Sequence, residues 1–334
     1  MEATRRIDVH HHITPAIYRE AMFKYGIDYS GIKSLNEWTP EASLAQMDAL
    51  GTETGICSIS EPALYPIVAK NKKEAKELAR SINEYMAEMS IKYPGRFGAF
   101  ALLPMPDVEA SLEEIAYALD ILHLDGVGLL SNYQEEYLGN KIFEPIFQEL
   151  QKRRACIYVH PSASPSALVR PEFVTNDGLA ELCFNTTRAA TNLILSGTMD
   201  RCPDIKVIFS HMGGTLPYLG WRMDNFIDAL KNDEKLAFMP EGVWSTIKSL
   251  TKSVPEYMSM FYYDTALATH KAAFQAVETS APGHTLFGSD AFYAPLISCG
   301  KVFVHNIDSY FTDKQELYAV NRGNAEIIFP RFRK

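Results

Sequence analysis

The residues best suited to chemistry lie in one short motif near the N-terminus, Asp8-Val9-His10-His11-His12. The motif ends an apolar run that is typical of a β-strand. Side chains alternate between the two faces of a strand, so His10 and His12 point the same way and His11 points the opposite way. Two imidazoles on one face can bind one metal ion. We therefore interpret His10 and His12 as metal ligands, and His11 as a residue that packs behind them.

Three further polar residues end later apolar runs: His160 in V-H-P, His211 in S-H-M-G-G and Asp290 in G-S-D. A single histidine after such a run is more often a hydrogen-bonded core residue. The same pattern at several strand ends is different, because the carboxyl ends of parallel strands in a barrel meet at one face. The sequence therefore predicts one joint site at this face. The remaining histidines lie in predicted helices or loops, and we interpret them as surface residues: His123, His270, His284 and His305.

The fourth apolar run ends in Leu129-Leu130-Ser131-Asn132 and carries no lysine. Barrel enzymes with two metals usually need a bridging acid or a carbamylated lysine at this place, so one metal is expected here. Mixed imidazole and carboxylate ligands suit Zn²⁺ first, and then Mn²⁺ or Fe²⁺.

Eight short apolar runs alternate with longer helical patterns, and several runs are continuously apolar, as in strands buried on both faces. The predicted strands are Arg6–His10, Thr54–Ser60, Phe97–Leu103, Gly126–Leu130, Ala155–His160, Lys206–Ser210, Met260–Asp264 and Thr285–Asp290. The predicted helices are Glu41–Leu50, Lys72–Tyr93, Val108–Leu122, Ile142–Arg153, Leu179–Met199, Leu216–Leu230, His270–Ser280 and Asp313–Ile328.

This alternation, without a break in composition, predicts a single domain over residues 1–334 with the α/β fold of a (β/α)8 TIM barrel. A doubly wound sheet is the alternative, but no glycine-rich turn follows the first strand. Pro40 fits the first turn of a helix, and Asp107 fits an N-cap. The barrel would carry loop insertions after strands 1 and 5, Ile13–Thr39 and Pro161–Asp177. Long loops on the catalytic face could be lids or plain surface loops.

The charge and cysteine content exclude several classes of protein. The net charge of −9, from 32 basic and 41 acidic residues, disfavours binding to nucleic acid or to anionic membranes. The chain has no apolar run long enough for a membrane helix and no signal-peptide pattern at its start. Five scattered cysteines, an odd number without a C-x-x-C pair, favour reduced thiols in a cytoplasmic protein.

Taken in order, I-D-x-H-x-H, V-H-P, S-H-x-G-G and G-S-D resemble the amidohydrolase superfamily, in its aminocarboxymuconate-semialdehyde decarboxylase-like branch. Several segments look most similar to salicylate and 6-methylsalicylate decarboxylases: Tyr133–Pro145, Thr187–Gly197, Ser210–Leu219, Tyr262–Ala266 and Ala281–Asp290. Two positions depart from the pattern of these relatives. The eighth-strand motif continues as Ala291-Phe292-Tyr293, and Asn185 stands where relatives often have glutamate.

The resemblance implies specific roles. His10, His12, His160 and Asp290 would hold the metal, and His211 would be the nearby base, with Asp290 also taking part in catalysis. Arg222, in the Gly220-Trp221-Arg222 segment, would bind the substrate carboxylate; a salt bridge on a helix face is the other interpretation. Relatives are usually homodimers or larger homo-oligomers, so the same is expected here.

Three functions remain open at this stage. The first is a metal-dependent non-oxidative decarboxylase of a small hydroxybenzoate-like or related carboxylic acid, which the resemblance favours. The second is a metal-dependent hydrolase or hydratase acting on a lactone, an amide or an unsaturated acid, because fold and metal alone do not fix the reaction. The third is a binding protein with a structural metal, in which His211 would have no purpose beside the ion.

Overall fold

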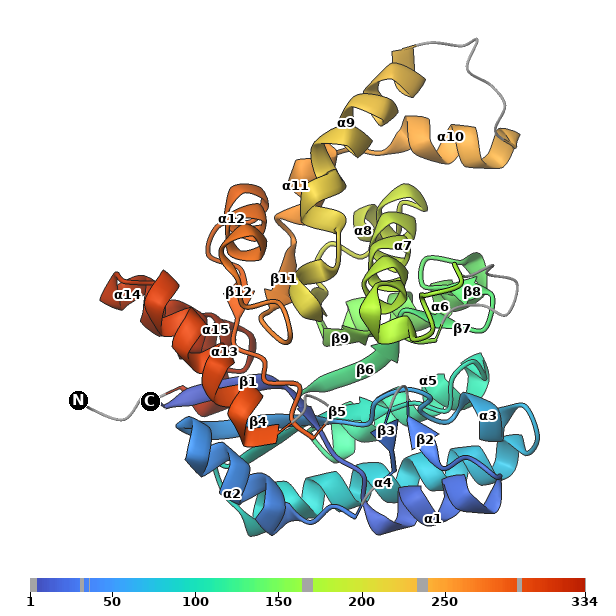
Figure 1. The fold of residues 1–334 in the computed structure, drawn as a ribbon. Coiled ribbons are helices and arrows are strands. Elements are labelled where there is room, and N and C mark those ends of the chain that lie inside the picture. Colours follow the sequence, from blue (N-terminus) through green and yellow to red (C-terminus); the bar gives the residue numbers. More distant parts are fainter. Residues whose placement is uncertain are drawn as a thin grey trace.

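Eight parallel strands form a barrel in the computed structural model, which describes residues 5–30, 33–35, 37–163, 171–232, 240–292 and 296–333. Figure 1 shows the strands in the middle of the molecule with helices around them. Their order around the sheet is their order in the chain, as expected when a helix follows each strand. The strands are β1 (Arg6–His12), β4 (Thr52–Ser58), β5 (Phe97–Leu102), β6 (Gly126–Leu130), β9 (Cys156–His160), β10 (Lys206–Phe209), β11 (Phe261–Asp264) and β12 (Thr285–Leu286).

The last strand meets the first and closes the barrel. The amide of Val9 donates to the carbonyl of Phe287 over 3.0 Å, and His11 forms a parallel bridge with Ala291. The register between β1 and β4 shifts between Asp8 and His11, the segment that contains His10. Such irregularities are common beside active sites because they re-aim side chains. The predicted (β/α)8 barrel is confirmed.

The alternation of side chains along the strands separates two parts of the core. Along β9, Cys156 and Tyr158 belong to the cluster inside the barrel, whereas Ile157 and Val159 belong to the larger cluster under the helices. His160 continues the inner face at the carboxyl end of the strand. The inner cluster also includes Phe329 and Phe332 from the end of the chain. The barrel is therefore packed below the ring of strand ends that carries the histidines.

The helices follow the predicted pattern with a few additions. As expected, Pro40 is the first residue of its helix and Asp107 is an N-cap whose side chain accepts from the amide of Ala110. The main helices are α2 (Pro40–Leu50), α4 (Lys72–Lys92), α5 (Val108–Ala116), α6 (Glu144–Lys152), α7 (Glu181–Leu195), α9 (Leu216–Asn232), α12 (Lys271–Ser280) and α13 (Leu296–Tyr310). The shorter ones are α1 (Ala16–Lys24), α3 (Tyr65–Val68), α8 (Thr198–Arg201), α10 (Glu241–Ser249), α11 (Val254–Met258), α14 (Lys314–Tyr318) and α15 (Asn324–Ile328).

Two regions differ from the prediction. Helix α13 follows β12 but was not predicted, and the expected helix Asp313–Ile328 is divided into α14, a π-helical turn and α15. Helices α9 and α10 extend away from the barrel (Figure 1). Among the described residues, no helix is both long and apolar enough to cross a membrane.

The insertion after β1 contains α1 and a small hairpin of β2 (Tyr29–Ser30) and β3 (Lys33–Ser34), and a second hairpin of β7 (Asn132–Tyr133) and β8 (Glu136–Tyr137) follows β6. In the first insertion Tyr18 and Trp38 are buried in the core rather than exposed on a lid. Of the second insertion, residues 164–170 lie outside the described part of the chain, as do Tyr293, Ala294 and Pro295 of the eighth-strand motif.

Candidate metal centre and active site

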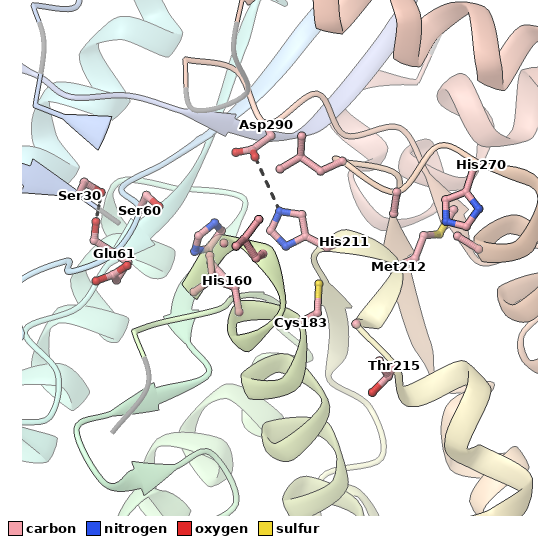
Figure 2. Close-up of a pocket in the computed structure, with 17 residues that line it drawn as sticks. Ser30, Ser60, Glu61, His160, Cys183, His211, Met212, Thr215, His270 and Asp290 are labelled. Carbon is pink, nitrogen blue, oxygen red and sulfur yellow. Dashed lines mark hydrogen bonds and ion pairs between the residues drawn. The ribbon is translucent and has the colours of Figure 1, made fainter. Parts of the chain in front are cut away.

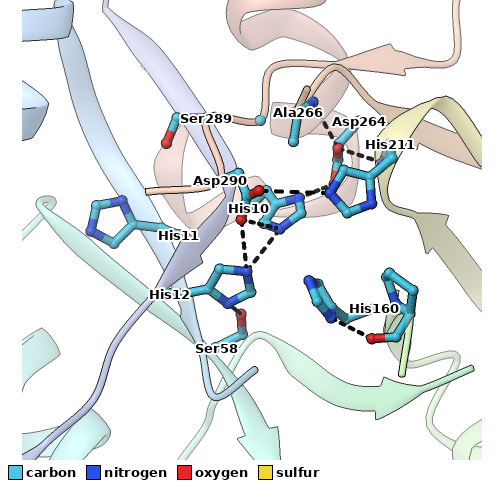
Figure 3. Close-up of polar contacts among 12 residues, drawn as sticks. His10, His11, His12, Ser58, His160, His211, Asp264, Ala266, Ser289 and Asp290 are labelled. Atoms are coloured by element: carbon cyan, nitrogen blue, oxygen red, sulfur yellow. Dashed lines mark hydrogen bonds and ion pairs between the residues drawn. The ribbon is translucent and has the colours of Figure 1, made fainter. Parts of the chain in front are cut away.

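Four side chains gather at the carboxyl ends of the strands: His10 and His12 from β1, His160 from β9, and Asp290 from the loop after β12. Each offers one ligand atom, and these atoms lie within 4.8 Å of one another. Figure 3 shows the rings of the three histidines turned toward the same place, with His11 pointing away. The structure thus brings together the four residues that the sequence analysis assigned to the metal.

Each imidazole of this quartet is oriented by a contact at its Nδ1 atom. Nδ1 of His10 donates to Asp264 over 2.9 Å, and Nδ1 of His160 donates to the carbonyl of Pro161 over 2.7 Å. Nδ1 of His12 lies 3.3 Å from the hydroxyl oxygen of Ser58. A carboxylate and a carbonyl can only accept, so Nδ1 of His10 and of His160 carries the proton. Their Nε2 lone pairs are then free to bind a metal.

Asp264, at the end of β11, forms hydrogen bonds with two parts of the site, His10 and the turn that begins at His211. One carboxylate oxygen accepts from the backbone amides of His211 and Ala266, both over 3.0 Å. The other accepts from His10 and, over 3.2 Å, from the hydroxyl of Tyr158. Asp264 therefore fixes both His10 and the turn that carries His211. Asp264 was assigned no role from the sequence, although it ends an apolar run just as His160 does.

Asp8 holds β1 against the loop that carries Asp290. Its carboxylate accepts from the backbone amides of His10 and Ser289 over 3.1 and 3.0 Å, and from the hydroxyl of Ser289 over 2.6 Å. Its second oxygen lies 3.2 Å from Nδ1 of His11, which points away from the quartet. The neighbour of Ser289, Asp290, has a φ of 55°. A left-handed backbone at a non-glycine residue is strained and is often found at functional sites.

The turn after β10 places His211 beside the quartet. His211 and Met212 both have a φ of 53°, and the two following glycines also have positive φ. A Cβ on Gly214 would lie 2.2 Å from the carbonyl oxygen of Cys183, so this turn packs directly on α7. Nε2 of His211 lies 3.8 Å from Asp290 Oδ2. Both ring nitrogens of His211 are buried and have no hydrogen-bond partner among the described residues.

The electrostatics of the site favour bound positive charge. Burial lowers the pKa of His12 to about 4 and that of His160 well below its usual value, so both rings are neutral. Although burial opposes it, the three neighbouring histidines hold the pKa of Asp290 well below its usual value. Burial also disfavours a charged His10, yet Asp264 and Asp290 raise its pKa to about 10. The two carboxylates therefore attract a cation, either a proton on His10 or a metal ion that replaces it.

A divalent metal fits the donor atoms in this centre. Oδ1 of Asp290 is buried and has no hydrogen-bond partner among the described residues, while the Nε2 atoms of His10 and His12 lie 3.2 and 3.1 Å from it. These two Nε2 atoms are 2.9 Å apart. Lone pairs so close together repel one another unless a cation lies between them.

A pocket of about 400 Å³ opens onto this centre. Figure 2 shows His160, His211 and Asp290 in its middle, Ser30, Ser60 and Glu61 on one side, and Thr215 and His270 on the other. Much of the remaining wall is apolar, with Leu179, Leu182, Met212, Leu267 and Ala273. No lysine or arginine occurs among the described residues that line it. His270 was expected on the surface and is exposed, but it lies at this pocket.

The structure places Arg222 elsewhere. It lies on α9, is exposed, and is not among the described residues that line the pocket. Several contributors to the site had no assigned role in the sequence analysis, among them Asp264, Tyr158 and Glu61. The place of Asp264 at a strand end could have indicated it, whereas Tyr158 and Glu61 carry no such signal.

Comparison with known proteins agrees with this geometry. Residues 7–331 match the family model described as amidohydrolase. Decarboxylase yanB of Aspergillus niger is 37% identical over 341 residues, which cover 98% of this chain and 88% of that protein. The 6-methylsalicylic acid decarboxylase of Penicillium expansum is 34% identical over 336 residues, covering 98% of this chain and 97% of that protein. A 5-carboxyvanillate decarboxylase of Novosphingobium aromaticivorans, solved with manganese, has the same fold, with a TM-score of 0.83 at 22% identity over 98% of this chain and 96% of that one. The chain belongs to the amidohydrolase family.

Proposed function

We propose that the protein is a metal-dependent non-oxidative decarboxylase of a hydroxybenzoate-like acid. The observation that carries the proposal is the quartet of His10, His12, His160 and Asp290, with His211 beside it, at a mainly apolar pocket of about 400 Å³. An aromatic ring suits apolar walls, and a carboxylate suits a cation at the quartet. Both curated relatives described above are decarboxylases, which supports this reaction over hydrolysis.

The reaction needs no oxidant. A proton adds to the ring carbon that bears the carboxylate, the bond between that carbon and the carboxylate breaks, and its electron pair stays with the ring as CO2 leaves. When bound, the metal supplies a Lewis acid and a template for the carboxylate and the neighbouring hydroxyl. His211 suits the role of proton carrier because both of its ring nitrogens are buried without a partner among the described residues. Asp290, 3.8 Å away, can pass this proton to the ring.

We propose zinc as the metal first, and then manganese or iron, because three imidazoles and one carboxylate suit these ions. The relative from Novosphingobium aromaticivorans holds manganese. The test is to remove the metal with a chelator and to restore activity with each ion separately. His160→Ala and Asp290→Ala should each lose the metal. Stoichiometric metal in both variants would contradict the proposed ligands.

We also propose that the chain associates with at least one further copy of itself. Helix α9 exposes Tyr218, Trp221 and Phe226, with 83%, 76% and 52% of their surface accessible, and Arg222 lies among them. A surface of this kind suits a homodimer or higher homo-oligomer, in which Arg222 of one copy could reach the substrate of another. Analytical ultracentrifugation tests this, and a monomer at micromolar concentration would contradict it. The described cysteines are free, which supports the cytoplasm as the place of action.

The reaction is tested by incubating the metal-loaded protein with salicylate-type acids, muconate semialdehydes and small lactones, and measuring CO2 and ring-opened products. We expect CO2 from at least one aromatic acid with a hydroxyl beside the carboxylate. Turnover of a lactone, without CO2 from any acid, would instead establish the hydrolase alternative.

A further inference from the structure

Glu61 is a buried acidic residue in the pocket that does not belong to the metal quartet. It lies three residues beyond the end of β4, and only 8% of its surface is exposed. Its backbone carbonyl accepts from the hydroxyl of Ser30. Its carboxyl group has no hydrogen bond or ion pair with any residue in the described part of the chain. A buried carboxyl without a partner is costly to keep, so its presence in a pocket wall indicates a ligand group that completes it.

The surroundings of Glu61 favour a neutral carboxylic acid. Burial raises its pKa to about 7, and the nearby Asp177 adds to this effect. No lysine or arginine lines the pocket among the described residues, so no positively charged side chain in the wall opposes the shift. A substrate carboxylate bound at the metal would add another negative charge and favour the protonated form further. A neutral carboxylic acid can donate one hydrogen bond and accept another.

The two sides of the pocket also differ in polarity. Ser30, Ser60 and Glu61 lie together on one side of His160, as Figure 2 shows, and each offers oxygen atoms. The rest of the wall includes Met212, Leu182 and other apolar side chains that can pack against a ring. A ligand that spans the pocket would therefore meet the metal in the middle and polar oxygen atoms on this one side.

We propose that Glu61 determines substrate specificity by hydrogen-bonding a second hydroxyl group on the ring, so that the preferred substrates are dihydroxybenzoate-type acids. This rests on the proposed decarboxylase function. A phenolic hydroxyl donates and accepts one hydrogen bond each, which matches the carboxylic acid group, whereas a ring hydrogen or methyl group would leave Glu61 without a partner. Sites built to hydrogen-bond a hydroxyl discriminate strongly against analogues that lack it.

The experiment compares salicylate, its 6-methyl derivative and the isomeric dihydroxybenzoates as substrates of the wild type, Glu61→Gln and Glu61→Leu. The wild type should favour at least one dihydroxybenzoate over salicylate by about tenfold or more in kcat/KM. Glu61→Leu should lower this ratio about tenfold, mainly through KM, because the apolar side chain cannot pair with the hydroxyl. Glu61→Gln, which still donates and accepts, should keep the ratio within about threefold.

Thr215→Val, on the other side of the pocket, is the matched control and should leave the ratio unchanged. The melting temperature of every variant shows whether it is folded, and its metal content shows whether it has bound the metal. An equal loss with all substrates in Glu61→Leu would overturn the proposal, as would a wild type that prefers salicylate or its methyl derivative. A Glu61→Gln variant as impaired as Glu61→Leu would also overturn it, because an ionised carboxylate would then be required.

Calorimetric measurement of the binding of the same acids tests the role of Glu61 independently of the decarboxylase function. If no acid yields CO2, the decarboxylase assignment fails. The role of Glu61 would then still be decided by whether the wild type binds a dihydroxybenzoate about tenfold more tightly than salicylate, and whether Glu61→Leu abolishes that difference. Equal affinities in the wild type would overturn it.

Discussion

At the metal centre each imidazole ligand has a contact that orients it, whereas on the Glu61 side of the pocket the carboxyl group has no partner in the described part of the chain. His10 is held by Asp264 and His160 by the carbonyl of Pro161. On the other side, the hydroxyl of Ser30 donates to the backbone carbonyl of Glu61 and not to its carboxyl group. Both regions are buried and lie in one pocket, so burial does not explain the difference.

This difference in hydrogen bonding fits two different roles: the imidazoles serve the reaction itself, and Glu61 serves the recognition of the substrate. A metal centre needs ligands fixed in tautomer and direction before the ion arrives, and outer contacts provide this. A residue that recognises a substrate group must keep its hydrogen-bonding capacity for that group. Substitutions near the quartet should therefore change metal affinity, and substitutions on the Glu61 side should change selectivity with little effect on the metal.

The strongest test of the metal side is Asp264→Asn, which changes the shape of the side chain very little. With the amide oxygen accepting from the amides of His211 and Ala266, the amide nitrogen would face Nδ1 of His10. Two donors cannot pair, so His10 would take the tautomer with its proton on Nε2 and could not bind the metal. We expect a loss of about 100-fold in metal affinity, measured by competition with a chromogenic chelator.

The matched control for this variant is Glu114→Gln. Glu114 is also fully buried and hydrogen-bonded, to Asn83 and Arg80, but it lies on α5 outside the pocket. It should lower the melting temperature without changing the metal affinity. If Asp264→Asn binds the metal as the wild type does, then the orienting contact is not required, and the contrast between the two sides of the pocket fails.

The sequence was sufficient to predict the barrel and the clustering of His10, His12, His160 and Asp290, because both depend on local patterns. Continuous apolar runs mark buried parallel strands, and a polar residue at the end of such a run lies at the catalytic face. The predicted ends of the strands were less accurate. The eighth run was expected to be a strand up to Asp290, but β12 ends at Leu286, and Asp290 lies in a loop with a φ of 55°.

The Glu61 side could not be predicted, because its character depends on distant segments. A single glutamate before a proline is typical of an exposed loop. Here Ser30, from the insertion after β1, contacts its backbone, and Asp177, from before α7, raises its pKa. Helix α13 lies beyond the eighth-strand motif, in a segment for which no helix was predicted. The place of Arg222 relative to a substrate would depend on a second copy of the chain, which a single sequence does not describe.

A smaller effect on the metal is expected from Asp8→Ala. This variant removes the acceptor for the amides of His10 and Ser289 and for the hydroxyl of Ser289, so the loop with Asp290 is held less firmly against β1. We expect about a tenfold loss of metal affinity, measured as for Asp264→Asn. Asp8→Asn should restore most of it, because its amide oxygen still accepts from both backbone amides. An equal loss in both variants would show that the charge of Asp8 matters rather than its hydrogen bonds.

On the Glu61 side, the expected effect is on stability rather than on the metal. The pKa of Glu61 is raised from its usual 4.5 to about 7, so between these values the folded protein keeps a proton that the unfolded chain has lost. The wild type should therefore lose stability relative to Glu61→Gln as the pH rises from about 4.5 to 7. Melting temperatures of the two proteins should diverge by about 2–4 °C over this range. A constant difference would mean that Glu61 is ionised throughout.

The smallest effect should come from Cys183→Ala, in the pocket wall formed by α7. Cys183 is half-buried and free, and burial raises the pKa of its thiol, so it is neither a reactive thiolate nor a metal ligand at neutral pH. Its backbone carbonyl, which packs against the turn after His211, is unchanged by the substitution. We expect unchanged metal content and less than about a threefold change in KM, because only a small apolar contact is lost. A large loss of metal in this variant would show that the wall and the quartet are coupled through the His211 turn, and the two regions would then have to be treated as one unit.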